Sequence, residues 1–297
     1  MVSSAVSDRS LTSEPGRLAN RKMPELPEVE IARRSLERWL GRSDVIGAEA
    51  ERTRVFRGGG EGRKGFEAVR GKLVRADRRG KLLLLGFDSG QGFLSHLGMT
   101  GKWVRREGAA AEPYSRARLR LADGSVVHYR DPRLFGRIEA HPAGTLESLP
   151  AVTALGPDPW LEPPTGRSLR EALGSTRVPI KVALMDQNRL AGLGNIHAAE
   201  ALWRAKIHPG RPARSLTPAE WSRLANAIRR GLAYALAAED SEEIAYVEEP
   251  GTENPFRIYA RAGEPCRRCG TRVRLLRQAG RRTDFCPHCQ PARRSSR

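Results

Sequence analysis

The sequence predicts a multidomain α+β protein with three successive parts. Short alternating segments separated by turns in residues 23–150 predict an antiparallel β-sandwich that begins with one helix. Segments with helical periodicity in residues 160–240 predict a helical domain. Four cysteines in residues 258–291 have the spacing of a tetrahedral zinc site, which predicts a small module held together by metal.

The 297-residue chain is strongly basic, with 52 Lys and Arg against 34 Asp and Glu and a formal charge of +18. Such a charge favours a polyanionic partner, nucleic acid before membrane, because no amphipathic lipid-binding stretch accompanies it. A basic surface without such a partner is the alternative that charge alone leaves open. No apolar run reaches the roughly 18 residues that a membrane-spanning helix needs.

Residues 1–22 contain no apolar core of the kind found in secretory signals. We expect them to be a disordered extension or the result of a misassigned start codon, and a transit peptide is less favoured.

The first helix opens on Met-Pro-Glu-Leu-Pro-Glu-Val-Glu at residues 23–30. Proline suits a first helical turn and acidic residues suit its positive end, so the motif can be purely structural. If translation began at Met23 and that residue were removed, Pro24 would instead present a secondary amine. Such an amine can attack the anomeric carbon of a sugar and form an iminium, with Glu25 as proton carrier. The helix that follows places apolar residues on one face: Val29, Ala32, Leu36, Trp39 and Leu40.

Strands and turns follow this helix. The leucines at residues 82–85, directly after Lys81, predict a buried strand, and residues 93–97 predict another. Residues 116–121 alternate in polarity, and Asp123-Gly124 predicts a hairpin turn into the next strand. The proline-rich residues 140–165 predict a linker or domain boundary.

Two helices are predicted in the second part. Thr217 to Glu220 form a capping box before a long helix, whose apolar face contains Trp221, Leu224, Ala225, Ile228, Leu232 and Leu236. The sequence Leu-Ala-Gly-Leu-Gly-Asn at residues 190–195 precedes the other helix. A glycine-rich turn before a helix presents free backbone N–H groups to an anion, although a turn of this kind is often only a turn.

The C-terminal part contains all four cysteines of the chain: Cys266, Cys269, Cys286 and Cys289. Their paired spacing indicates one structural zinc ion bound by four thiolates in a reducing compartment, rather than disulfides. An acidic segment, residues 239–253, precedes this module, and we assign residues 241–257 to a loop or linker.

The motif at residues 23–30 resembles the N-terminus of formamidopyrimidine-DNA glycosylase, in the family shared with endonuclease VIII, and further matches extend to residue 290. The resemblance implies a bifunctional enzyme of base-excision repair that releases damaged purines, of the formamidopyrimidine or 8-oxoguanine type, and then cleaves the abasic site by β,δ-elimination. It implies Pro24 as nucleophile, Glu25 for proton transfer, Glu28 as a support of the active-site helix or a hydrogen-bond partner of the sugar, and Lys81 as a contact to a phosphate near the lesion.

Two loops, residues 96–101 and 131–136, resemble the lesion-recognition loops of this family, although either alone could be a turn with a packed apolar residue. The resemblance implies that Met99, Arg133 and Phe135 fill the gap left by an extracted base. Leu134 stands where relatives often have a second arginine.

The remaining matches concern the DNA backbone. Residues 192–200 are similar to the family's helix–two-turns–helix motif, which implies Asn195, and to a lesser degree Lys181, as phosphate contacts. Arg281 matches the arginine of the family's zinc ribbon. The acidic segment 239–253 corresponds to a loop that closes over the extruded base, and a solvated linker is an equal interpretation.

The implied partner is double-stranded DNA with damaged bases or abasic sites, bound by a cytoplasmic monomer without a membrane. Two alternatives stay open. One is an endonuclease VIII-like enzyme for oxidised pyrimidines, which Leu26 and the Asp-Pro-Arg-x-Phe-Gly sequence of residues 131–136 disfavour. The other is a noncatalytic damaged-DNA-binding protein, if residues 1–22 stay attached and Pro24 has no free amine.

Overall fold

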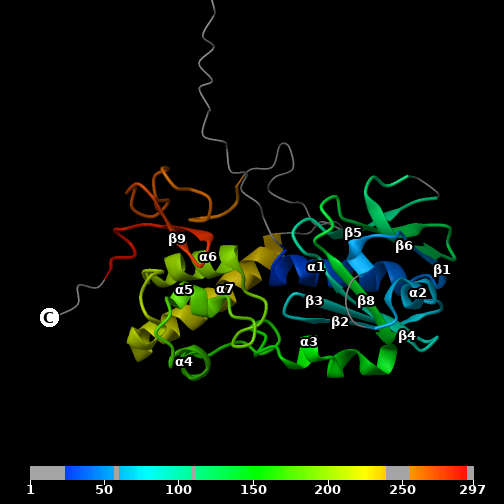
Figure 1. Ribbon diagram of the computed structural model, residues 1–297. Helices are drawn as coiled ribbons and strands as arrows, with labels where there is room; N and C mark the ends of the chain where they lie inside the picture. Colours follow the sequence, from blue (N-terminus) through cyan, green and yellow to red (C-terminus); the bar gives the residue numbers. More distant parts are fainter. Residues whose placement is uncertain (1–23, 57–59, 109–110, 239–253, 293–297) are drawn as a thin grey trace, which may run out of the picture.

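The computed structural model describes residues 24–56, 60–108, 111–238 and 254–292. The predictions for residues 1–22, for Met23 and for the acidic segment 239–253 lie outside this part of the chain. The described residues form a β-rich lobe and a helical lobe, and the C-terminal ribbon packs on the helical lobe (Figure 1).

The first lobe is a sandwich of two antiparallel four-stranded sheets, as the sequence predicts. One sheet has the order β1-β6-β7-β5 and contains β1 (Val45–Ala50), β5 (Lys102–Arg106), β6 (Ser115–Leu121) and β7 (Val126–Arg130). The other has the order β2-β3-β4-β8 and contains β2 (Leu73–Arg79), β3 (Leu82–Phe87), β4 (Gln91–His96) and β8 (Arg137–Pro142). The alternation in residues 116–121 is confirmed, because every second residue of β6 is buried. The short elements η1 (Arg54–Phe56) and α2 (Gly62–Glu67) also belong to this lobe.

Helix α1 (Leu26–Leu40) lies between the two lobes and belongs to both of their cores (Figure 1). The predicted apolar face of α1 is buried, and Val29 and Leu36 pack into the core of the sandwich. Leu26, one residue after Glu25, instead packs among the apolar side chains of the helical lobe. The N-terminus of α1 is therefore fixed where the two lobes meet.

The proline-rich segment contains more structure than a linker. Within residues 140–165, the chain completes β8 and then forms η2 (Ala143–Ser148) and α3 (Pro150–Thr153). Leu146 and Val152 pack against Leu84 and Leu94, so these elements cover the outer face of the second sheet. Of the two interpretations, the linker is wrong for residues 143–153, because apolar side chains between the prolines are buried against that sheet, and the domain boundary stays a prediction.

The helical lobe contains α4 (Gly166–Leu173), α5 (Ile180–Leu184), α6 (Asn195–Ala205), η3 (Ala213–Ser215) and α7 (Pro218–Ala238). The predicted face of α7 is buried along its length, from Trp221 to Leu236. The predicted capping box is present, since the Thr217 N–H donates to Glu220 Oε2 (2.8 Å) and the Glu220 N–H donates to Thr217 Oγ1 (3.3 Å).

Strands β9 (Arg274–Gln278) and β10 (Arg281–Phe285) form the hairpin of the C-terminal ribbon. The ribbon packs on α6, where Ala199 and Trp203 contact a cluster that includes Ile258 and Cys266. Within the described ranges, no helix combines the length and apolarity needed to cross a bilayer.

Candidate active site

The carboxylate of Glu25 is bound at the N-terminus of α6, in the other lobe. The backbone N–H groups of Gly194 and His197 donate to Glu25 Oε2 (2.8 and 3.1 Å), and that of Ile196 donates to Oε1 (2.8 Å). Glu25 is 1% exposed. The first turn of a helix attracts negative charge and has unpaired N–H groups, so this position holds a carboxylate in one orientation.

The glycine-rich turn makes this contact possible. A Cβ atom at Gly194 would lie 2.4 Å from Glu25 Cδ, and one at Gly192, whose φ is +91°, would lie 2.6 Å from Leu26 Cδ1. The predicted anion-binding turn therefore exists, but its anion is a side chain of the same protein. The expectation of free N–H groups at this turn is wrong for the groups that Glu25 occupies.

Further hydrogen bonds fix the backbone on either side of Glu25. The Glu25 N–H donates to Glu28 Oε2 (2.9 Å), and the Leu26 N–H donates to the Gly192 carbonyl (3.1 Å). Glu28 thus supports the start of α1, one of its two predicted roles. Pro24, which precedes this anchored residue, is buried at the same junction.

Lys81 lies close to this junction, at the turn between β2 and β3. Burial lowers the pKa of Lys81, while the nearby Glu25 and Glu28 raise it and Arg281 lowers it. Three further residues predicted for the site, Glu25, Glu28 and Arg281, are therefore within electrostatic range of Lys81.

A buried ionic network holds the turn that carries Lys81. Arg78 donates to Asp158 Oδ2 (2.5 Å) and to Glu30 Oε2 (3.0 Å), and the Gly80 N–H also donates to Asp158 Oδ2 (2.8 Å). Arg78, Glu30 and Asp158 are each at most 5% exposed. Removing one partner of such a network leaves a buried charge unpaired, so we expect the network to fix the turn.

Asn195 and Arg281 line a groove beside Glu25, with a volume of about 270 Å³. The other residues that line it are Glu25, Met99, Ile196, Tyr259 and Arg282. Burial raises the pKa of the Tyr259 phenol, against the opposing effect of its hydrogen bond to Asn195. Arg281 is exposed here. The groove brings a predicted residue from each lobe and one from the ribbon next to Glu25.

Lys181 has a different environment. It is fully buried, and its Nζ donates to Asn195 Oδ1, to Thr283 Oγ1 (2.8 Å) and to the Arg282 carbonyl (3.1 Å). Burial lowers the pKa of Lys181 to about 8. An ammonium group has three protons to donate, so these acceptors use all of them. The predicted phosphate contact of Lys181 stays a prediction, and this geometry favours a link between α5, α6 and the ribbon.

The two predicted lesion loops are packed against each other. A Cβ atom at Gly98 would lie 2.4 Å from the Phe135 carbonyl carbon, so the loops approach through their backbones. Asp131, fully buried, accepts hydrogen bonds from Thr100 Oγ1 (2.8 Å), the Gly136 N–H (2.7 Å) and the Arg133 N–H (3.2 Å). Phe135 is 46% exposed despite its size. Met99 also lines the groove beside Glu25, which places this loop at the candidate site.

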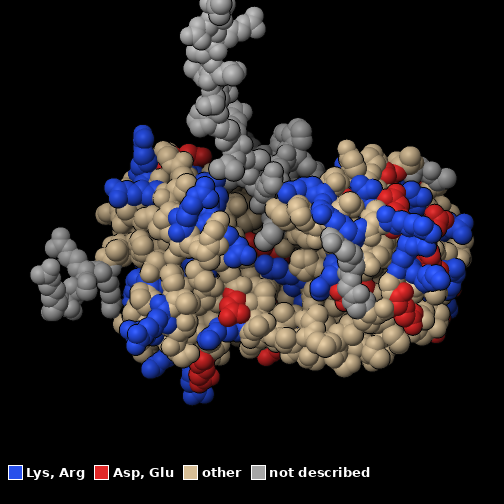
Figure 2. All heavy atoms as spheres, in the orientation of Figure 1, with Lys and Arg blue, Asp and Glu red and all other residues tan. Residues whose placement is uncertain are grey.

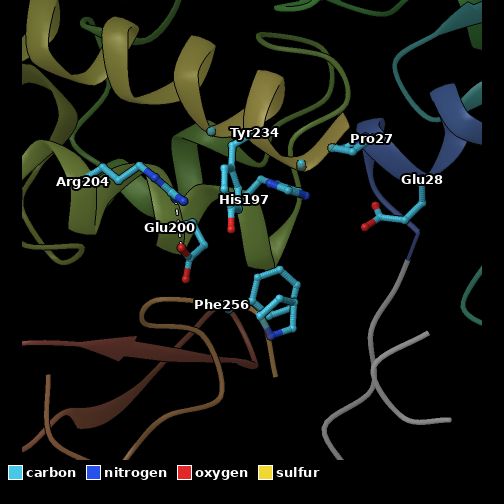
Figure 3. Close-up of a pocket in the computed structure, with 10 residues that line it drawn as sticks. Pro27, Glu28, His197, Glu200, Arg204, Tyr234 and Phe256 are labelled. Carbon is cyan, nitrogen blue, oxygen red and sulfur yellow. Dashed lines mark hydrogen bonds and ion pairs between the residues drawn. The ribbon is translucent and has the colours of Figure 1, made fainter. Parts of the chain in front are cut away.

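A second cavity, of about 150 Å³, also adjoins the first turn of α1, where Pro27 and Glu28 line it (Figure 3). It is bounded by α1, α6, α7 and the chain around Phe256. Glu28 and His197 line it together with Pro27, Glu200, Arg204, Gly231, Tyr234, Ala235, Pro255 and Phe256. Half of these residues are apolar and the other half carry a polar or charged group, so the cavity offers both apolar surface and hydrogen-bonding groups to a small molecule.

The four cysteines meet the geometric requirements of a zinc site. Their sulfur atoms all lie within 4.8 Å of one another, and Cys269 Sγ lies 3.5 Å from the sulfurs of Cys286 and Cys289. Tetrahedral coordination with Zn–S bonds of about 2.3 Å places thiolates roughly 3.8 Å apart, so these residues fit one structural Zn²⁺.

Several residues of the site are not predicted by the sequence. His96 is one, since its Nδ1 accepts from the Gly98 N–H (3.0 Å) and burial lowers its pKa to about 4. Tyr259, Arg282 and Asp158 are others. Their positions beside the groove or in the ionic network depend on contacts between distant parts of the chain. Among these residues, only His96 has a local sequence feature that points to the site, namely its position at the start of the predicted loop of residues 96–101.

Basic residues surround the groove. Figure 2 shows Lys and Arg side chains along the hollow between the lobes and on its rims, whereas acidic and basic side chains alternate at the outer edge of the β-rich lobe. A positive hollow of this kind favours a polyanion that lies across both lobes.

Comparison with known proteins gives the same picture over almost the whole chain. Residues 23–138 match the formamidopyrimidine-DNA glycosylase N-terminal domain, residues 155–245 the H2TH domain of that enzyme, and residues 263–292 the zinc finger found in FPG and IleRS. The chain is 37% identical over 282 residues to the formamidopyrimidine-DNA glycosylase of Gloeobacter violaceus, and this alignment covers 92% of this chain and 99% of the relative.

Two solved structures of the Lactococcus lactis FPG are also similar. A mutant in complex with DNA containing Fapy-dG has a TM-score of 0.79 and 32% identity, over 91% of this chain and 100% of the other. The wild-type protein in complex with DNA containing an oxidised pyrimidine has a TM-score of 0.80 and 32% identity, over the same shares.

Proposed function

The chain belongs to the formamidopyrimidine-DNA glycosylase family, enzymes of base-excision repair, and we propose that Pro24 is its nucleophile and Glu25 its proton carrier. The observation that carries the proposal is the position of Glu25. Its carboxylate, one residue after Pro24, is held by three N–H groups of α6 at the edge of a basic groove. The proposed substrates are damaged purines in duplex DNA, bound by a monomer in the cytoplasm.

In the proposed reaction, the lone pair of the terminal Pro24 amine attacks C1′ of the damaged nucleotide. The base leaves with the electron pair of the glycosidic bond and takes up a proton. The Pro24 nitrogen loses its proton, the sugar ring oxygen gains one, and the ring opens to an iminium. Glu25 lies beside the reacting atoms and carries these protons.

Strand cleavage follows from the same intermediate. The iminium acidifies the hydrogens at C2′, so loss of one of these protons expels the 3′ phosphate. A second elimination expels the 5′ phosphate. Hydrolysis of the remaining imine returns the free Pro24 amine.

We propose that the DNA backbone follows the groove, with Lys81, Asn195 and Arg281 at its phosphates. Phosphate contacts fix the position of the duplex without reading its sequence. Met99, Arg133 and Phe135 then take the space of the extruded base. The zinc ion holds the ribbon that carries Arg281 and takes no part in the chemistry.

The cavity of Figure 3 is the proposed place of the extruded base. It adjoins Glu28, and hence Pro24 and Glu25, and it is the more apolar of the two hollows at the α1 N-terminus. Among the residues that line this cavity, Glu28 is the carboxylate nearest to Pro24 in sequence. It lines this cavity and is positioned to bind a donor group of the base or sugar.

Borohydride trapping on abasic-site DNA tests the nucleophile, because it reduces the iminium to a stable covalent adduct. We expect the chain that begins at Pro24 to be trapped, and the chain that retains residues 1–22 not to be trapped. Pro24→Gly keeps a terminal amine and should retain part of the adduct. Equal trapping of both forms through a terminus other than Pro24 would contradict the assignment, and an absence of trapping in both forms would favour the noncatalytic alternative.

Oxidised pyrimidines are a second candidate class of substrate. The observation that favours them is the Lactococcus lactis FPG complex with DNA containing an oxidised pyrimidine. Single-turnover excision from matched duplexes with either 8-oxoguanine or an oxidised pyrimidine compares the two classes. Faster release of the purine is the expected result, and faster release of the pyrimidine would reassign the substrate.

A further inference from the structure

Two guanidinium groups lie close to the Phe135 ring. The Cζ atom of Arg133 is 4.6 Å from the centroid of the Phe135 ring, and that of Arg54, from η1, is 5.1 Å from it. Guanidinium groups at such distances are attracted to an aromatic face. The two contacts favour one orientation of an exposed ring that could otherwise populate several rotamers in water.

Arg54 also binds the backbone of the same loop. Its Nε donates to the Leu134 carbonyl and its Nη2 to the Arg133 carbonyl, both at 2.7 Å. The planar guanidinium can bind two adjacent carbonyl groups and face the ring at the same time. Three contacts therefore join Arg54 to three successive residues of the loop.

The loop needs such support because its backbone is strained. Leu134 has φ +56°, a left-handed conformation that residues with a Cβ rarely adopt. The side chain of Leu134 packs against the sandwich core, and Asp131 binds the N–H groups at both ends of the turn. Arg54 donates to two carbonyl groups of this strained turn, those of Arg133 and Leu134.

We propose that Arg54 is a positioning residue that sets the Phe135 wedge before DNA binds. The inference rests on the proposed role of Phe135 in filling the gap of an extruded base. A ring that is already oriented does not have to be ordered at the moment when the base leaves the stack. Arg54 thus acts on extrusion through Phe135 and not on the chemistry at C1′.

The test compares Arg54→Ala with Arg52→Ala, which removes the same charge from an exposed arginine two residues earlier. Both are made in the zinc-loaded chain that begins at Pro24. Three quantities are measured: excision of a base paired in duplex, cleavage of a preformed abasic site, and affinity for undamaged duplex at several salt concentrations. Phe135→Ala shows how these three quantities change when the wedge side chain is absent.

We expect Arg54→Ala to slow excision of the paired base by about 10–100-fold, as a misplaced group of this kind does. Abasic-site cleavage, affinity and salt dependence should match Arg52→Ala. Arg54→Lys should fail to rescue excision, because an ammonium does not reproduce the planar, stacked contact.

Three outcomes would overturn the proposal. A flatter salt dependence by about one unit of log-log slope, with rescue by Arg54→Lys, would make Arg54 a phosphate contact instead. Equal loss in excision and abasic cleavage would give it a general structural role. Excision equal to that of Arg52→Ala would exclude a part in extrusion. Borohydride trapping of the Arg54→Ala chain separates these outcomes from a failure of the Pro24 assignment, because trapping needs only the nucleophile.

Discussion

Replacing Gly194 by alanine should displace the Glu25 carboxylate while leaving the fold in place. The added Cβ would lie 2.4 Å from both Cδ and Oε1 of Glu25 and 2.8 Å from its Cγ, well inside van der Waals contact. Gly194 has φ −126° and ψ −155°, an extended conformation that alanine adopts without strain. The atoms that must move are the end of the Glu25 side chain.

The expected size of the effect differs for catalysis and stability. A displacement of about 1 Å at a catalytic group costs roughly 100-fold in rate, equivalent to about 2.7 kcal/mol of barrier. Hydrogen bonds to a charged acceptor are each worth about 1.5–3 kcal/mol, but the displaced carboxylate can regain water in the groove. We therefore expect a loss of only about 1–3 kcal/mol in the free energy of unfolding.

Single-turnover excision and urea unfolding measure the two effects in the chain that begins at Pro24. Gly144→Ala is the matched control, because no atom lies within 4 Å of its added Cβ and the residue is exposed on η2. An excision rate for Gly194→Ala equal to that of Gly144→Ala would refute the reasoning. It would mean that the contact between Glu25 and α6 does not set the geometry of the reaction.

The remaining predictions concern the DNA contact, the metal and pH. Arg281→Ala should weaken binding to damaged and undamaged duplex alike and flatten the log-log salt dependence by about one unit, and an unchanged slope would exclude a phosphate contact. Removal of zinc should abolish duplex binding but leave most of the helical circular dichroism, and unchanged binding after verified metal loss would contradict the role of the ribbon. Burial raises the pKa of Glu220, but hydrogen bonds from Arg211 and Thr217 outweigh it and lower the pKa from 4.5 to about 2. The pKa of Glu220 in the folded state is lower than its ordinary value, so this stabilisation is complete above pH 4.5 and is lost as the pH falls towards 2. The urea midpoint of Glu220→Gln should therefore depend less on pH in that range than the urea midpoint of the wild type.

The predictions from sequence succeeded where the signal is local. The buried faces of α1 and α7 follow from periodicity, and the start of α7 follows from the capping box of Thr217 and Glu220. The alternation of β6 and the Asp123-Gly124 turn predicted one hairpin of the sandwich. The cysteine spacing predicted sulfur atoms that do lie together. In each case, residues that are close in sequence determine the feature.

The contacts that assemble the site are not local, and the sequence pattern did not predict them. Glu25 and Gly194 are separated by 169 positions, and Arg78 and Asp158 by 80. The glycine-rich turn was correctly interpreted as an anion site, but nothing nearby in the sequence identifies its anion as Glu25. Arg54 and Leu134 are likewise 80 positions apart, so neither the arginine nor the left-handed leucine suggested their contact.

Residues next to the proposed nucleophile Pro24 are anchored to the helical lobe, whereas the proposed wedge Phe135 lies in the β-rich lobe, so α1 must fix the relation between them. Glu25 and Leu26 are hydrogen bonded to the turn of residues 192–197 in the helical lobe, and Leu26 is buried in the core of that lobe. Further along the same helix, Val29 and Leu36 are buried in the sandwich, which also carries Phe135. Rotation of one lobe against the other would expose apolar surface at one end of α1 or the other, and this costs free energy in proportion to the area exposed. The helix therefore holds Pro24 and Phe135 at a fixed separation, and their proposed roles as amine nucleophile and wedge on one nucleotide require this.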